Sequence, residues 1–464
     1  MKDADLRSMF EGVAAYAAKR RAGDDDRLHR PEASYAEQLE RFRLDVDAGG
    51  VAPGQAIAEL INKAEPGLAA FTGPRFFGWV IGGSNPVGVA ADWLTGIWGQ
   101  NAGNHQATPS AAAVERQAGR ALLDLLDLPR ESTVGFVTGG TMANFTCLAA
   151  ARGAVLRRAG WDVEADGLFG APPITVIIGE EAHSSVFVAV RYLGLGANRV
   201  VRVPVDREGR MLAPAFADAI AKATGPVIAI VQAGQINTGA FDPFGEIMKA
   251  AKARNAWVHV DGAFGLWARA TPSHKQLTQG IEEADSWAVD GHKWLQTPYD
   301  CGYAVVRDRE AHERAMQIAA SYLPGATEEG HNPYDYSPEL SRRARGFATW
   351  TMIRHLGRRG IAEMVTRHCA LARRFAEKLG SEPGVEIVND VVLNQVAVRF
   401  GNDDQTKATI ARIQSDGVCF AGGSQWNGQW IMRISVINEN TTEADVDRSV
   451  EAMLGAWRAV RGRN

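Results

Sequence analysis

The chain has 464 residues, of which 46% are hydrophobic and 22% are charged, and its formal net charge is −4. This length predicts two or three structural units, and the composition is that of a globular protein. The slight negative charge gives no general attraction to nucleic acid or to anionic membranes. The sequence contains no run of about 18 uncharged apolar residues, so we predict no membrane span.

The N-terminus and the cysteines indicate the compartment. The first residues, MKDADLRSMFEGVAAYAAKRR, lack the basic stretch and the unbroken apolar run of a secretory signal. The four cysteines lie far apart and fit neither a CxxC metal site nor a dense disulfide framework. We therefore predict a cytoplasmic protein with reduced thiols and no bound metal.

Residues 1–70 have a helical, amphipathic pattern with a charged beginning and a later apolar run, QAIAELINKAEPG. Such a segment has too little apolar surface to fold alone. We predict a helical arm that packs on another part of the protein.

Residues 71–340 have a different pattern, in which short runs rich in β-branched residues alternate with longer helical stretches. The runs are continuously apolar, which predicts strands covered on both faces and therefore a mostly parallel, seven-stranded sheet between helices. This is an α/β domain. Its predicted strands are VGFVT (from 134), ITVIIG (174), VVRVPV (200), VIAIVQ (227), AWVHVD (256), SWAVD (286) and GYAVV (302).

Residues 341–464 begin with a long helical pattern, GFATWTMIRHLGRRGIAEMVTRHCALARRFAEKLG. Two strand patterns follow, VVLNQVAVRF and WIMRISVI, with one helix between them and one after them. This order predicts a small C-terminal α+β domain.

Polar residues directly follow several of the predicted strands of the α/β domain, which is where open α/β sheets place functional groups. Each has an ordinary structural interpretation, because Asp caps helices, Gly-Gly-Thr connects a strand to a helix, and most lysines and histidines are solvated or hydrogen-bonded. Their occurrence together at one sheet edge is what indicates a site. They are Thr141, His183, Gln235, Asp261, Asp290, His292 and Lys293, together with the turn glycine Gly140.

A phosphate-binding turn, an acid, an imidazole and a lysine match the chemistry of pyridoxal 5′-phosphate (PLP). The amine of Lys293 forms a Schiff base with the aldehyde, and desolvation lowers the pKa of a buried lysine enough to make it nucleophilic. A carboxylate keeps the pyridine nitrogen protonated, so that the ring accepts electrons. A helix that begins at Gly140 offers unpaired N–H groups to the phosphate.

Four motifs, FVTGGTMAN, EAHSS, HVDGAFG and DGHKW, resemble in the same order the cofactor-binding segments of the fold-type-I group II amino-acid decarboxylases, which include the aromatic-L-amino-acid decarboxylases. The resemblance covers residues 70–350 well and the two ends loosely. It implies a PLP-dependent enzyme that converts an L-amino acid to the amine and CO2. It also implies a homodimer with shared active sites and an exchanged N-terminal arm.

The resemblance assigns roles to single residues. Lys293 would carry the cofactor, Asp261 would pair with the pyridine nitrogen, His183 would stack on the ring and help deliver a proton, and Ala263 would lie beneath the ring. Gln235 stands where many relatives have a threonine near the phenolic oxygen, which is a departure from the family. Residues around the phosphate would be Gly140, Thr141, Asp290 and His292.

Two further segments resemble parts of the family's substrate site. In the first, aromatic residues (Trp79, Trp93 and Trp98) favour an aromatic substrate, although Trp79 equally fits interface packing. Polar residues of the same segment (Asn104, His105 and Gln106) suit a polar or acidic substrate equally well. The second segment, within residues 319–345, resembles the family's catalytic loop, whose tyrosine protonates the carbanion. We prefer Tyr336 over Tyr334 for that role.

Other outcomes stay open on the sequence alone. The same scaffold supports aminotransferases, which clamp the substrate carboxylate with an arginine, and Arg433 is either such a clamp or a structural arginine. Oxidative deaminases are also related, but the resemblance associates them with loss of the histidine that here is His183. A non-catalytic homologue is disfavoured because every expected cofactor contact is present. A nicotinamide enzyme is disfavoured because no GxGxxG follows an early strand.

Overall fold

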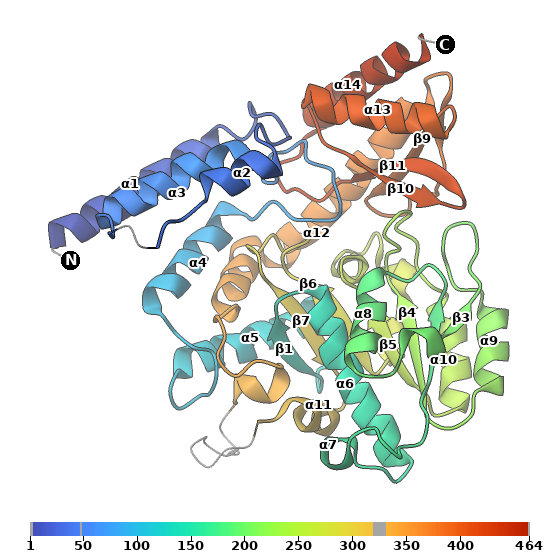
Figure 1. Ribbon diagram of the computed structural model, residues 1–464. Helices are drawn as coiled ribbons and strands as arrows, with labels where there is room; N and C mark the ends of the chain where they lie inside the picture. Colours follow the sequence, from blue (N-terminus) through green and yellow to red (C-terminus); the bar gives the residue numbers. More distant parts are fainter. Residues whose placement is uncertain (1–2, 47–48, 319–330, 463–464) are drawn as a thin grey trace.

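The computed structural model describes residues 3–46, 49–318 and 331–462. It begins with three helices, α1 (Asp3–Ala22), α2 (Tyr35–Arg41) and α3 (Pro53–Ala64). In α2 the side chain of Ser34 accepts from the backbone N–H of Glu37, and the Glu37 carboxylate accepts from the backbone N–H of Ser34, so both helix-terminal donors are satisfied. Figure 1 shows α1 and α3 side by side, reaching away from the rest of the chain.

The central element is a seven-stranded sheet of order β1-β7-β6-β5-β4-β2-β3. Strands β2 to β6 pair in parallel with their neighbours, and β7 runs antiparallel to both β6 and β1. All seven predicted runs form these strands, so the prediction of a mostly parallel α/β sheet is confirmed. The strands are β1 (Thr133–Val137), β2 (Thr175–Gly179), β3 (Val201–Val203), β4 (Val227–Gln232), β5 (Trp257–Asp261), β6 (Ser286–Asp290) and β7 (Gly302–Val306).

Helices cover both faces of this sheet, and alternate side chains of one strand enter different cores. On β4, Ile228 and Ile230 enter one core, whereas Ala229 and Val231 enter the other. The first core contains α6 (Gly140–Arg158), α8 (Ser184–Tyr192) and α11 (Arg309–Met316). The second contains α5 (Pro109–Leu125), α9 (Ala213–Lys222) and α10 (Phe244–Ala253).

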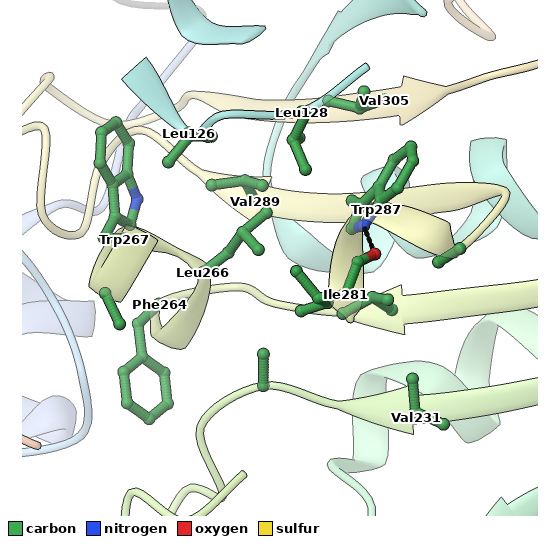
Figure 2. Close-up of a cluster of buried hydrophobic side chains, with 14 of the residues drawn as sticks. Leu126, Leu128, Val231, Phe264, Leu266, Trp267, Ile281, Trp287, Val289 and Val305 are labelled. Carbon is green, nitrogen blue, oxygen red and sulfur yellow. Dashed lines mark hydrogen bonds between the residues drawn. The ribbon is translucent and has the colours of Figure 1, made fainter. Parts of the chain in front are cut away.

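Figure 2 shows part of the second core, where Trp287, Val289 and Val305 of the sheet face Leu126 and Leu128. The indole N–H of Trp287 donates to the carbonyl of Ile281 at 3.0 Å, so the one polar atom of this large ring is satisfied. Burial on both faces explains why the strands lack an alternating polar pattern.

The C-terminal part has its own antiparallel sheet, of order β10-β11-β9-β8, and its own core. The strands β9 and β11 were predicted, but β8 and β10 were not. β8 has three residues, and β10 begins with two glycines and lies at the sheet edge, so neither carries a strand pattern in the sequence. The elements are β8 (Val385–Ile387), β9 (Gln395–Phe400), α13 (Asp403–Asp416), β10 (Gly422–Trp426), β11 (Gln429–Ser435) and α14 (Glu443–Arg461).

One long helix, α12 (Gly346–Gly380), joins the two sheets, as Figure 1 shows. It is interrupted at Gly357, whose φ of 61° is left-handed and favours glycine. The helix contacts α4 (Pro86–Trp98) and α5, and it also contacts α14, β8 and β9 of the C-terminal part. The remaining elements are α7 (Val163–Asp166), η1 (Glu65–Gly67), η2 (Ala197–Arg199), η3 (Gly265–Ala270), η4 (Lys275–Thr278), η5 (Ile281–Glu283) and η6 (Pro333–Tyr336).

Residues 75–83 form backbone hydrogen bonds with the C-terminal part and with the loop after β6. The backbone N–H of Phe77 donates to the carbonyl of Phe420 at 2.8 Å, and that of Gly82 donates to the carbonyl of His292 at 3.0 Å. The same strip therefore touches the C-terminal part and the loop after β6. Among the described helices, none has the length and apolar character of a membrane span, and all four cysteines are buried and unpaired.

Candidate active site

Lys293 lies in the turn after β6, with its side chain 15% exposed. Its Nζ is 3.0 Å from Oδ2 of Asp290 and 5.7 Å from the centre of the Phe264 ring. A lysine in such an apolar position needs a counter-charge, because an isolated buried ammonium is strongly disfavoured. The structure thus places the predicted lysine beside a buried carboxylate and an aromatic face.

The beginning of α6 forms the predicted phosphate turn. Its N-cap residue, Gly139, makes no side-chain capping bond, so the first N–H groups of the helix receive no side-chain cap. A side chain at Gly139 would come within 3.1 Å of the His292 ring, and one at Gly140 within 3.1 Å of the Asp290 carboxylate. Only glycine leaves room for a ligand here, with Thr141 next along the helix.

Two buried polar atoms beside this turn lack hydrogen-bond partners within the described residues. Nδ1 of His292 and Oδ1 of Asp290 are buried, and neither has a hydrogen-bond partner in the described part of the chain. The His292 ring also stacks on Tyr299, with ring centres 4.3 Å apart. Unsatisfied buried polar atoms are costly, so a site that collects them is built for a ligand that satisfies them. The residues present therefore fit PLP.

Asp290 has a more specific position than the sequence predicts. Its Oδ2 lies 3.0 Å from Lys293 and 3.7 Å from Nε2 of His292. A carboxylate repels a phosphate dianion, whereas it stabilises an ammonium. The geometry therefore favours Asp290 as the partner of the lysine amine.

Asp261 ends β5 and is 5% exposed. Its Oδ1 accepts from the backbone N–H of Ala263 at 3.3 Å, and its Oδ2 accepts from the side-chain amide of Asn144 at 3.4 Å. The carbonyl of Ala263 in turn accepts from the backbone N–H of Asp290 at 2.9 Å, which joins the ends of β5 and β6. Sequence reasoning missed Asn144, although it lies one turn beyond Gly140 on the same helix.

His183 caps the N-terminus of α8, where its Nδ1 accepts from the backbone N–H of Ser185 at 3.3 Å. Desolvation by the surrounding protein lowers the pKa of His183. The negative charge of Asp261 opposes that effect, while the positive charges of Lys293 and Arg433 add to it. His183 is therefore within electrostatic reach of all three groups.

Arg433 lies on β11, and its guanidinium is buried with Nε and Nη2 lacking hydrogen-bond partners within the described residues. Burial lowers the pKa of this arginine to about 10, so the group remains charged at neutral pH. A guanidinium edge that is buried without protein partners suits an anionic ligand group.

Gln235 uses both ends of its amide inside the protein. Its Oε1 accepts from the backbone N–H groups of Asn237 and Thr238 at 2.5 and 3.1 Å. Its Nε2 donates to the carbonyl of Glu181 at 3.4 Å, which ties the loop after β4 to the segment before His183. These bonds hold the loop in place beside the site.

The substrate candidates fall into two groups. Trp79 is 55% exposed and belongs to an aromatic cluster with Phe71, Phe76 and Phe420, whose ring centres lie 5.6 to 6.0 Å from it. The chain from Trp79 reaches the carbonyl of His292 through Gly82.

The polar candidates lie in the turn before α5. Asn104 Oδ1 accepts from the backbone N–H of Ala107 at 2.8 Å, and Nδ1 of His105 lies 2.8 Å from Oδ1 of Asn332. Gln106 is exposed. No hydrogen bond joins these three side chains to Lys293 or His183 of the same chain within the described ranges.

The two candidate tyrosines lie in η6, and residues 319–330 of the predicted catalytic loop lie outside the described residues. Tyr336 is 4% exposed, its hydroxyl donates to Glu313 at 2.5 Å, and its ring stacks on His331. Burial and the neighbouring carboxylate raise the pKa of this phenol. The backbone N–H of Tyr334 donates to the carbonyl of Gly103. Neither phenol is brought to Lys293 of its own chain by a described hydrogen bond.

Comparison with known proteins gives a consistent picture. Residues 54–401 match the family model described as the pyridoxal-dependent decarboxylase conserved domain. An aromatic-L-amino-acid decarboxylase of Bacillus atrophaeus is 26% identical, over 80% of this chain and 79% of the relative. The acidic amino acid decarboxylase GADL1 of Xenopus tropicalis is 29% identical, over 76% of this chain and 70% of the relative. A crystal structure of Oryza sativa TDC with PLP and tryptamine superposes with a TM-score of 0.91 at 21% identity, covering 99% of each chain.

Proposed function

The chain belongs to the pyridoxal-dependent decarboxylase family and is a PLP-dependent amino-acid decarboxylase, and we propose that its substrate is an aromatic L-amino acid and that Lys293 carries the cofactor. The observation that supports the substrate is the aromatic cluster of Trp79 beside the loop that holds Lys293. Aromatic rings prefer offset or edge-to-face contacts with other rings, which this cluster offers.

When bound, PLP supplies a conjugated, protonated ring that accepts the electron pair released as CO2 departs. We propose that Lys293 holds it, with Gly140, Thr141 and His292 around the phosphate. The carboxylate of Asp290, 3.0 Å from the amine, holds the lysine side chain where it would meet the cofactor aldehyde.

The other residues orient the reacting groups. Asp261 would place its carboxylate at the ring nitrogen, and Ala263 would lie beneath the ring. His183, whose pKa is lowered, is neutral at pH 7 and can accept or donate a proton near the reacting carbon. Arg433, charged and without partners at Nε and Nη2, binds the incoming carboxylate. Tyr336 remains our proposal for the loop tyrosine, acting at the site of a second subunit.

The substrate is tested by measuring CO2 and amine from tryptophan, tyrosine, DOPA, glutamate, aspartate and 2,4-diaminobutyrate. We expect the highest kcat/KM with an aromatic substrate. Trp79→Ala should lower that value up to about tenfold, because an aromatic contact that the substrate would cover contributes up to about 1.4 kcal/mol. Trp161→Ala is the control and should leave kcat/KM unchanged, because Trp161 follows the C-terminal end of α6 and its indole N–H donates to the carbonyl of Gly167.

The relatives also include the acidic amino acid decarboxylase GADL1, so an acidic substrate is the alternative. The polar Asn104, His105 and Gln106 are the residues that favour it. A preference for glutamate or aspartate that survives Trp79→Ala would contradict the aromatic proposal. A preference for diaminobutyrate would do the same.

We also propose a homodimer in which residues 1–70 form an exchanged arm, residues 71–340 the cofactor-binding domain and residues 341–464 a small domain. The supporting feature is a groove of about 700 Å³ between α1, α3 and α4, lined mainly by apolar side chains that include Met9, Phe10, Val13, Ile57, Trp93 and Ile97. Helix α4 also exposes Leu94 and Trp98. A second copy of the chain would cover this apolar surface.

The dimer is tested by analytical ultracentrifugation of wild type and of Ile97→Asp. The wild type should sediment at twice the mass of the chain. The variant should dissociate, because a carboxylate in an apolar interface is strongly disfavoured. A monomeric wild type with full activity would contradict the proposal.

A further inference from the structure

A line of fully buried polar side chains runs behind Asp261, away from the open side of the site. It joins β5, β6 and α6. The indole N–H of Trp257 donates to Oγ of Ser286 at 2.9 Å, and that oxygen lies 3.0 Å from Nδ1 of His259. Nε2 of His259 lies 2.8 Å from Oδ1 of Asn144, whose amide nitrogen is 3.4 Å from Oδ2 of Asp261.

The donors and acceptors along this line have only one consistent arrangement. Burial lowers the pKa of His259 to about 3, so the ring is neutral and has one N–H. Asn144 must turn its NH2 toward Asp261, because its oxygen would be repelled by the carboxylate. Its oxygen therefore faces Nε2 of His259, which carries the hydrogen, and Nδ1 accepts from the hydroxyl of Ser286.

The amide of Asn144 also reaches the second group that faces the cofactor. Its nitrogen lies 3.4 Å from Oγ of Ser185, and that oxygen is 2.7 Å from Nδ1 of His183. One side chain thus touches the carboxylate at the ring nitrogen and the residue that holds the stacking imidazole. His259, Asn144 and Ser286 are all fully buried, so solvent does not compete for the bonds among these three residues.

We propose that His259 and Asn144 are positioning residues that hold the Asp261 carboxylate aimed at the ring nitrogen of PLP. The inference rests on the proposed role of Asp261. His259 fixes the rotation of the Asn144 amide, and the correctly turned amide donates to the carboxylate. Without His259 the amide loses the bond that prevents it from turning its oxygen toward Asp261.

The test uses two ligands that differ in a single ring atom. PLP has the pyridine nitrogen, and its deaza analogue has C–H in that place, so only PLP responds to the charge of Asp261. Binding of each to the cofactor-depleted full chain is followed by tryptophan fluorescence, and the readout is the ratio of the two dissociation constants. In wild type PLP should bind more tightly than the analogue.

Asn144→Leu and His259→Leu should reduce this preference about tenfold or more, since a hydrogen bond to a charged group contributes more than 1.4 kcal/mol. His259→Gln keeps a side-chain N–H for Asn144 and should restore most of the preference. Ser286→Ala is the mildest change and should reduce it about threefold, so the inference is testable even if the leucine variants do not fold.

His312→Leu is the matched control. His312 is equally buried with a pKa of about 3, and it also bonds a hydroxyl through Nδ1 and an oxygen through Nε2, but it lies on α11. It should leave the preference unchanged. Equal weakening of both ligands in Asn144→Leu, His259→Leu and Ser286→Ala would overturn the inference and leave only a structural role.

Asp261→Asn separates this failure from failure of the proposed function. It should abolish the preference for PLP over the analogue. If Asp261→Asn keeps the preference, the proposed role of Asp261 is wrong, and the inference falls with it. If it abolishes the preference while the His259 and Asn144 variants keep it, only the inference is wrong.

Discussion

Arg342 is buried and Arg433 is half-buried, with Nε and Nη2 inside the protein, and the two guanidiniums have different partners. Arg342 makes two parallel bonds of 2.7 Å to the carboxylate of Glu115, and its Nε donates to Oγ of Ser337 at 3.0 Å. Arg433 has no hydrogen-bond partner at Nε or Nη2 in the described part of the chain. The first arrangement satisfies a buried charge within the fold, and the second leaves it for a ligand.

The same contrast holds for carboxylates. Both oxygens of Glu115 are bonded by Arg342, whereas Asp290 bonds Lys293 through Oδ2 and leaves Oδ1 without a described partner. Buried charges alone therefore do not identify the site. Its mark is that several buried polar atoms lie close together without partners.

The strongest test of this contrast is Lys293→Ala. Removing the amine should abolish the visible absorption of the bound cofactor and lower kcat by at least about a thousandfold, because the nucleophile that holds PLP is lost. Absorption spectra and CO2 release measure the two effects.

Lys275→Ala is the control for Lys293→Ala, since Lys275 pairs with Asp127 at 2.7 Å on the surface. It should leave both the spectrum and kcat unchanged. Retention of the visible band in Lys293→Ala would mean that another amine carries the cofactor.

The next test compares stability at the two arginines. Glu115→Ala should lower the free energy of unfolding by about 3–5 kcal/mol, because it leaves the buried charge of Arg342 without its partner. Arg433→Leu removes a buried charge that lacks partners at two of its nitrogens, so stability should stay unchanged or rise. Urea unfolding with saturating PLP measures both values.

Arg433→Leu should weaken substrate binding instead. The KM for the amino acid should rise about tenfold or more, since a charge-assisted hydrogen bond contributes more than 1.4 kcal/mol. Loss of stability as large as that of Glu115→Ala, with unchanged KM, would show that Arg433 is a structural residue and would end the contrast.

Sequence alone predicts the large sheet because both of its faces are buried, which leaves continuous apolar runs such as VIAIVQ and SWAVD. It also predicts which residues follow the strands, since strand ends are marked by glycine, aspartate and histidine. The sequence carries no comparable mark for β8 and β10, which are short, edge-positioned or rich in glycine. Their strand structure depends on pairing with β9 and β11.

The parts of the site that sequence does not predict depend on tertiary contacts. Asn144 carries one local signal, a polar residue in the otherwise apolar stretch ANFTCLAAA, but its bond to Asp261 arises only when α6 packs on β5. The approach of Asp290 to Lys293 and the absence of described partners at Nε and Nη2 of Arg433 are likewise properties of packing. A sequence pattern identifies neither feature, because both depend on which side chains the folded chain places next to each other.

The last test concerns the pH dependence of stability, where His312 and His259 should behave alike. Burial lowers the pKa of each to about 3, well below the ordinary value of 6.5. Below pH 6.5 the unfolded chain binds a proton that the folded chain does not, so stability is full above pH 6.5 and falls as pH is lowered. Each histidine should contribute a slope of about 1.4 kcal/mol per pH unit between pH 6 and 4.

His312→Gln and His259→Gln should therefore flatten the pH dependence equally, measured by urea unfolding at pH 7.5, 6, 5 and 4.5 with saturating PLP. Their effects on cofactor discrimination should differ when each is changed to leucine, because only His259 bonds to a residue that touches Asp261. The pH dependence of stability measures the burial of the two histidines, which His312 and His259 share. The discrimination between PLP and its deaza analogue measures whether a histidine acts on Asp261, which we expect only of His259. Unequal slopes would mean that the two rings differ in burial or in partners, and that the control is not matched.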